Sequence, residues 1–128
     1  MEKLNVNNQG LTELLIPEGS KEVYCFNNQL TELILPDTLE RLCCHNNQIK
    51  ELTLPYSLET LWCHKNQLRE LILPKALILL CCYNNQLTEL ILPYSLKTLW
   101  CDHSVKLFNL KDHMDINIRY HKILNKKI

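Results

Sequence analysis

A nineteen-residue repeat constrains this chain more than any other feature of its sequence. Proline recurs at intervals of nineteen residues, at Pro17, Pro36, Pro55, Pro74 and Pro93. The same interval separates five cysteines, Cys25, Cys44, Cys63, Cys82 and Cys101. A fixed period near twenty residues is the signature of a solenoid, in which each repeat forms one coil that stacks on the next.

Aligned on this period, the repeats follow the pattern L-x-x-L-x-C-x-x-N-x-L-x-x-L-x-L-P-x-x. The chain thereby resembles the leucine-rich repeat family, in a short variant with cysteine in place of one leucine. The resemblance covers residues 1 to about 102, or six coils, and the pattern is similar to repeats in proteins of bacteria and amoebal giant viruses. In that family an asparagine ladder closes the turn after each strand. The matching residues here are Asn28, Asn47, Asn66 and Asn85, with Gln9 in the first coil.

The first half of each coil predicts a short parallel strand, because alternate residues of L-x-x-L-x-C point to the same side. The predicted strands cover about 22–26, 41–45, 60–64, 79–83 and 98–102. The second half is too short for a helix and ends in proline, so an extended back side is expected. The predicted fold is mainly β, a right-handed leucine-rich repeat solenoid. The five cysteines of the repeat point inward in this arrangement and are predicted to be core, since free cysteine is usually buried.

The repeat weakens after Cys101, so residues 1–102 are assigned to the solenoid and residues 103–128 to a half coil and a cap or tail. A terminal coil exposes its core unless it is capped. Within residues 112–127, Ile116, Tyr120, Ile123 and Leu124 fit one face of a helix, which favours a capping helix. Met114, Ile116, Ile118 and Tyr120 also alternate as in a strand, and this alternative stays open.

Two outward columns on the predicted strands carry the candidate binding residues. The first column contains Tyr24, Cys43, Trp62, Cys81 and Trp100. The second contains Phe26, His45, His64, Tyr83 and Asp102. Trp and Tyr are enriched at interface hot spots, and the family resemblance implies that the strand-bearing face is the recognition surface. We therefore expect a non-enzymatic module that binds an unidentified protein through this face.

Two further hypotheses use other features of the sequence. Self-assembly into a homo-oligomer would proceed through the N-terminal edge or through a back stripe of Ile34, Ile72 and Ile91, which is sticky if exposed. A thiol or zinc sensor would use Cys43, His45 and His64, with Cys81 as a further candidate. Because closely spaced ligand pairs are missing, we predict no metal and no cofactor.

Composition adds limits on location and partner. The formal net charge is zero, and only the segment after residue 102 is basic, which does not favour nucleic acid as the partner. Each apolar run is soon broken by proline, so no membrane span is expected. Seven cysteines without a secretory leader predict a reducing compartment, the cytoplasm of the producing cell or of an infected host.

Overall fold

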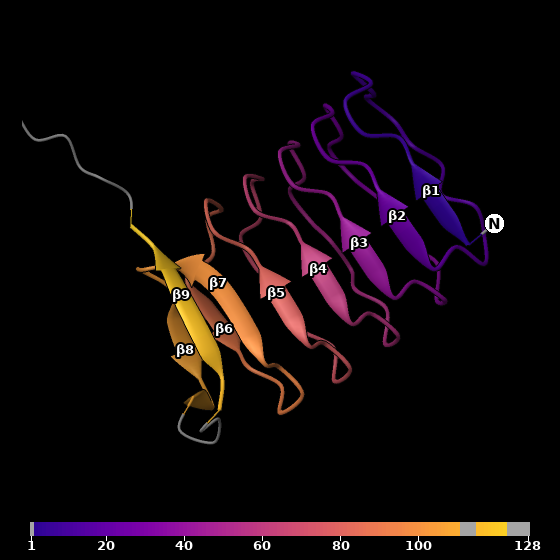
Figure 1. Cartoon of the computed structure of the whole chain (residues 1–128). Helices are drawn as coiled ribbons and strands as arrows, with labels where there is room; N and C mark the ends of the chain where they lie inside the picture. The colour runs from indigo at the N-terminus through magenta and orange to yellow at the C-terminus, as the bar shows by residue number, and fades with distance from the viewer. Residues whose placement is uncertain (1, 111–114, 123–128) are drawn as a thin grey trace, which may run out of the picture.

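The computed structural model describes residues 2–110 and 115–122, which form a parallel β solenoid of about six turns (Figure 1). Seven strands lie side by side in one sheet in the order β1-β2-β3-β4-β5-β7-β9. They are β1 (Lys3–Asn5), β2 (Glu22–Tyr24), β3 (Arg41–Cys43), β4 (Thr60–Trp62), β5 (Leu79–Cys81), β7 (Thr98–Asp102) and β9 (Asn117–His121). On the other side of the last coils, β6 (Glu89–Ile91) pairs with β8 (Lys106–Phe108). The predicted β solenoid with a parallel strand in each coil is confirmed.

The register of the main sheet follows the sequence period. Leu42 in β3 lies opposite Val23 in β2 and Leu61 in β4, one repeat away in each direction. Four of the strands are shorter than predicted and end two residues early, after Tyr24, Cys43, Trp62 and Cys81. Hydrogen bonds between coils nevertheless continue past these ends: the amide of Asn27 donates to the carbonyl of His45 at 3.1 Å.

The core is a row of leucines and cysteines inside the coils. Leu39, Leu42 and Cys44 of one coil have no exposed surface, and Leu58, Leu61 and Cys63 repeat the arrangement in the next coil. All five cysteines of the repeat are at most 1% exposed, which confirms their prediction as core residues. A fully buried leucine contributes about 1.5–3 kcal/mol relative to an exposed one, so this row provides much of the stability.

In four consecutive coils, one asparagine satisfies backbone groups of two coils at once. The side-chain oxygen of Asn47 accepts from the Leu30 amide at 2.9 Å. Its side-chain amide donates to the carbonyls of Cys25 and Cys44, both at 3.0 Å. Corresponding bonds are made by Asn28, Asn66 and Asn85. Because buried peptide groups are costly when unpaired, this column holds consecutive coils together.

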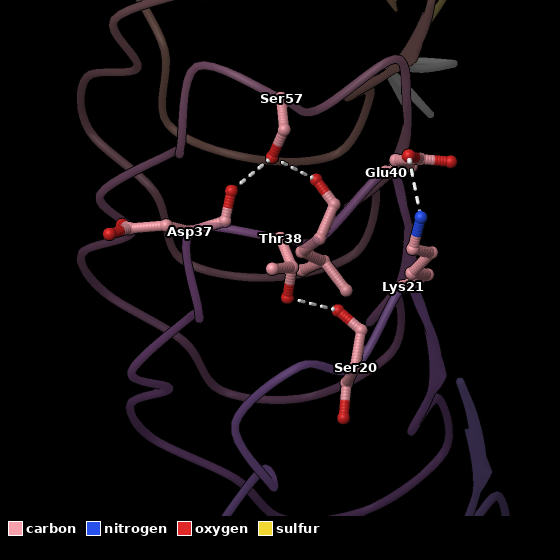
Figure 2. A network of polar contacts seen from close by, with 7 residues as sticks. Ser20, Lys21, Asp37, Thr38, Glu40 and Ser57 are labelled. Carbon is pink, nitrogen blue, oxygen red and sulfur yellow. Dashed lines mark hydrogen bonds and ion pairs between the residues drawn. The ribbon is translucent and has the colours of Figure 1, made fainter. Parts of the chain in front are cut away.

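The corner that precedes each strand is closed by a turn and by hydroxyl groups (Figure 2). The carbonyl of Pro36 accepts from the amide of Leu39 at 3.2 Å, and each of the other prolines makes the same bond three residues on. The hydroxyl of Thr38 donates to the Ser20 carbonyl at 2.8 Å, and that of Ser57 donates to the carbonyl of Asp37 (Figure 2). Hydroxyl side chains thus tie the corners at Thr38, Ser57 and Ser95 to the preceding coil, whereas Ala76 occupies the same position in the intervening coil.

The expectation of a C-terminal capping helix is wrong for the residues that the structure describes. Asn117–His121 form β9, which pairs in parallel with β7 and places Ile118 opposite Leu99 and Tyr120 opposite Cys101. These pairs are again nineteen residues apart, so the coil period continues beyond residue 102. The segment that contains the alternating Ile116, Ile118 and Tyr120 forms a strand and not a helix, because the edge of β7 offers backbone groups with which it can pair. The rest of the 112–127 prediction, residues 112–114 and 123–127, lies outside the described residues.

Candidate interaction surfaces

The second outward column forms a row of stacked rings across the sheet. Ring centroids are 4.3 Å apart between Phe26 and His45, 4.3 Å between His45 and His64, and 4.6 Å between His64 and Tyr83. The planes are within 20° of parallel in each pair. Parallel strands lie about 4.8 Å apart, so residues at the same repeat position stack almost face to face. Interactions of this kind stabilise adjacent coils, because aromatic pairs contribute about 0.5–1.5 kcal/mol beyond their burial.

The first outward column alternates between large and small side chains. Tyr24, Trp62 and Trp100 are half-buried, whereas Cys43 and Cys81 are only 8% and 2% exposed. Both cysteines were expected on the surface, and the structure corrects this. In the register of the sheet each of these thiols lies between two larger side chains, Cys43 between Tyr24 and Trp62 and Cys81 between Trp62 and Trp100.

Two members of the second column are also buried, contrary to expectation. His64 is 8% exposed because it lies between the rings of His45 and Tyr83. Asp102 is 5% exposed, and its carboxylate accepts from the Asn84 amide at 2.8 and 2.9 Å and from the Asn85 amide at 3.3 Å. In earlier coils the equivalent amide bonds a backbone carbonyl, so Asp102 replaces that carbonyl as acceptor.

Six of the ten predicted binding residues therefore remain partly exposed. They are Tyr24, Phe26, His45, Trp62, Tyr83 and Trp100, called here the strand face. Both ends of this surface carry a cation over a ring: Lys3 Nζ lies 5.2 Å from the Tyr24 centroid, and Arg119 Cζ lies 5.3 Å from the Trp100 centroid. The uncovered centre of the strand face is thus Trp62 with the adjacent part of the ring row.

The histidine and thiol groups of this region are electrically neutral near pH 7. Burial lowers the pKa of His64 to about 4, with smaller contributions from His45 and Lys65. Burial raises the pKa of Cys81 to about 12 and that of Cys43 to about 11. The contact of 3.3 Å between Cys81 Sγ and His64 Nδ1 is accordingly a hydrogen bond between a thiol and a neutral imidazole, not a thiolate–imidazolium pair.

The structure does not bring the sensor residues together around one point. Within residues 2–110 and 115–122, no group of three His, Cys, Asp or Glu side chains is arranged to hold a metal ion. His45 and His64 stack with an interplanar angle of 10°, so their ring nitrogens lie in two parallel planes and do not converge on one ion.

The largest exposed apolar side chains lie on the opposite surface of the solenoid. One repeat position there contributes Leu15, Ile34, Thr53, Ile72, Ile91 and, through the pairing of β8 with β6, Phe108. We call this column the back stripe. Leu15 is 92% exposed, Ile34 87%, Ile72 83% and Ile91 62%. Sequence reasoning identified three of these isoleucines but missed Leu15, although it lies nineteen residues before Ile34.

Two grooves cross the back stripe. The larger, of about 1000 Å³, is lined by Thr53, Tyr56, Ile72 and Lys75 among other residues. The smaller, of about 710 Å³, lies between Ile72 and Ile91 beside Tyr94. Tyr56 and Tyr94 are 92% and 74% exposed and occupy one repeat position, which the sequence analysis did not single out. The sequence signal that could have identified them is the recurrence of tyrosine at one position of the repeat.

A column of glutamates runs beside the back stripe at Glu13, Glu32, Glu51, Glu70 and Glu89, with Lys106 continuing it on β8. All five carboxylates are exposed, and in the part of the chain that the structure describes none has an ion-pair partner within 4.0 Å. Lys50 and Arg69 precede two of these glutamates and are also exposed. The back surface is thus apolar along its centre and charged along one side.

Neither a family model nor a curated protein matches this chain. No helix in residues 2–110 or 115–122 is long and apolar enough to span a membrane. The function of this chain is therefore inferred from the geometry and chemistry of its two surfaces.

Proposed function

We propose that the chain is a non-enzymatic protein-interaction module of the leucine-rich repeat type that binds a partner protein through its strand face. The observation that carries this proposal is the row of stacked aromatic and imidazole rings on a parallel sheet, in which Phe26, His45 and Tyr83 are half-exposed and His64 is buried between its neighbours. Rings that are already held by stacking lose little conformational entropy on binding, which favours affinity. Trp62, between the two cation-covered ends, is the expected centre of the interface.

The chemistry of the strand face also describes its partner. Its six residues carry no carboxylate or ammonium group, and the burial of His64 and His45 lowers their pKa values, which keeps the ring row neutral. Such a surface favours an uncharged, apolar or aromatic protein segment over nucleic acid, which requires cationic side chains. Seven buried thiols that form no disulfide support a reducing location, which we propose to be the cytoplasm.

Affinity capture with matched variants tests the proposal. Trp62→Ala should lower the affinity for the captured partner at least thirtyfold, because truncation of a central hot-spot tryptophan typically costs about 2 kcal/mol or more. Ile34→Ser, on the back stripe, is the control and should retain the partner. Urea unfolding of both variants verifies that they fold. Equal capture by the wild type and the folded Trp62→Ala variant would contradict binding through the strand face.

A further inference from the structure

We propose that the stacked pair of His45 and His64 is an acid-sensitive element of the strand face, which opens the ring row on protonation and releases the bound partner. This inference deepens the binding role proposed for the strand face and rests on it. His64 stacks on His45 and on Tyr83. Its Nδ1 lies 3.3 Å from Cys81 Sγ, and its ring meets that of Trp62 edge to face with centroids 6.0 Å apart. A change in the charge of this one ring therefore reaches the centre of the interface.

The contact with Cys81 determines which nitrogen of His64 carries the proton. Burial raises the pKa of Cys81 to about 12, so the thiol stays protonated and donates to Nδ1. The proton of the neutral imidazole accordingly lies on Nε2. An imidazolium carries protons on both nitrogens. Protonation of His64 therefore replaces this hydrogen bond by an N–H group that faces sulfur, which is a weak acceptor.

Protonation of His45 is unfavourable for a different reason. Its Nδ1 is buried, and among the residues that the structure describes this atom has no hydrogen-bond partner. In the imidazolium the same atom would be a buried N–H donor without an acceptor. The two imidazole rings are also only 4.3 Å apart by centroids and within 10° of parallel, so two imidazolium rings would bring like charges into contact. The closed ring row thus opposes each protonation, and the second one most.

The charged and titratable groups around the pair do not offset these penalties. Lys65 is a cation that lowers the pKa values of both imidazoles further. The thiols of Cys43 and Cys81 are neutral because burial raises their pKa values, and the same holds for the phenol of Tyr83. Phe26, on the other side of the pair, carries no charge.

Carboxylates, which would stabilise an imidazolium, are directed elsewhere. Within residues 2–110 and 115–122, no carboxylate oxygen lies within 4.0 Å of a ring nitrogen of either imidazole. Asp102 occupies the same column one coil beyond Tyr83, but its carboxylate accepts from the backbone amides of Asn84 and Asn85. An imidazolium in the closed row would therefore have no anionic partner.

The direction of the pH effect follows from these contacts. Above pH 6.5 both imidazoles are neutral and the ring row is closed. The closed row lowers the pKa of His64 from 6.5 to about 4, whereas a ring that has left the stack binds a proton readily. Between these values each unit of decreasing pH favours the open row about tenfold through His64 alone. Because Trp62 contacts His64, opening also displaces the centre of the strand face, and the partner loses the surface that it binds.

NMR of the imidazole groups, labelled with nitrogen-15, tests the structural part without any partner. At pH 7.5 we expect His64 to have a bare Nδ1 and a protonated Nε2. Between pH 6.5 and 4 the proton contacts between the rings of His64 and Tyr83 should disappear, while the amide signals of the buried leucines persist. His64→Phe keeps a ring but no titratable group, and its contact with Tyr83 should persist over the same range. Two protonated imidazoles in an intact stack would overturn the proposal, as would a stack that is lost only when the whole fold is lost.

The functional part is tested with the protein that wild-type chain captures at pH 7.5. For the wild type, its dissociation constant should rise about tenfold or more at pH 4.5. For the double variant His45→Phe with His64→Phe, the rise should be less than about threefold, because no imidazole is left in the ring row. Equal weakening in both would contradict release by the histidine pair. Retention of the captured protein by the folded Trp62→Ala variant would instead contradict binding through the strand face, and the NMR titration is independent of that outcome.

Discussion

The two surfaces of this solenoid differ in how the side chains at one repeat position pack against each other. On the strand face, residues at one repeat position stack on each other, and each ring from Phe26 to Tyr83 packs against the next ring in the row. On the back, residues at one repeat position stand apart, and Ile34 and Ile72 remain more than 80% exposed. A repeat therefore fixes where side chains recur, whereas their shape decides whether they bury each other: flat rings at strand spacing do so, and branched aliphatic chains beside charges do not.

The largest expected effect concerns what both surfaces share, the buried asparagine column. Asn47→Ala leaves the Leu30 amide and the carbonyls of Cys25 and Cys44 without their side-chain partner. We expect the free energy of unfolding to fall by about 2–4 kcal/mol, since each unsatisfied buried group costs about 1–3 kcal/mol. Urea unfolding measures this loss. The neighbouring exposed Gln48→Ala should change it by less than about 0.5 kcal/mol, and an equal loss in both variants would refute the assigned role.

A dependence on pH should originate from the strand face and not from the back. The pKa of His64 is lowered from 6.5 to about 4, so the unfolded chain binds more protons between these values. Stability is complete above pH 6.5 and declines as the pH falls toward 4, where the folded state also becomes protonated. His64→Phe should make the melting temperature less sensitive to pH in this window. Identical pH profiles of wild type and His64→Phe would contradict this origin.

The rate of thiol labelling tests whether Cys43 and Cys81 are buried beneath neighbouring side chains or form an accessible reactive site. Burial raises the pKa values of Cys43 and Cys81, so both should react slowly with a thiol-specific disulfide reagent at pH 7.5. Trp62→Ala removes part of their cover and should accelerate labelling about tenfold or more, whereas Ile72→Ala should not. Rapid labelling of the folded wild type would instead support a thiol sensor.

The smallest effect tests the regularity of the turns. Lys65 adopts a φ of 60° at a repeat position where four other coils have asparagine, at Asn8, Asn27, Asn46 and Asn84. Asparagine tolerates this left-handed conformation better than lysine, and Asn27 already donates to Asn8 across one such pair at 2.7 Å. Lys65→Asn should therefore stabilise the fold by about 0.5–1 kcal/mol in urea unfolding. No gain, or a loss, would show that the turn imposes no penalty on lysine.

Much of the fold follows from the sequence because the nineteen-residue period specifies coil length, strand pairing and the inward cysteines. The exposure of side chains on the strand face could not be predicted from one column of residues taken by itself. Cys43 and Cys81 point outward, but larger side chains of neighbouring coils lie beside them: Trp62 is opposite both, and His64 Nδ1 lies 3.3 Å from Cys81 Sγ. The final strand was predicted only as the alternative to a helix, because Tyr120 occupies the cysteine position and Arg119 the tryptophan position, although another step of nineteen from Leu99 reaches Ile118.

The most direct test of the difference between the surfaces is the free energy of unfolding of Tyr83→Ala and Ile72→Ala. Both are measured in urea at protein concentrations that keep the chain monomeric. Tyr83 stacks on His64 and lies 4.6 Å from Trp100 by ring centroids, so its truncation should cost about 2 kcal/mol. Ile72→Ala should cost less than about 0.5 kcal/mol, because the side chain is exposed in the single chain. Equal losses, or a larger loss for Ile72→Ala, would contradict a strand face packed within the fold and a back stripe that is exposed in the folded chain.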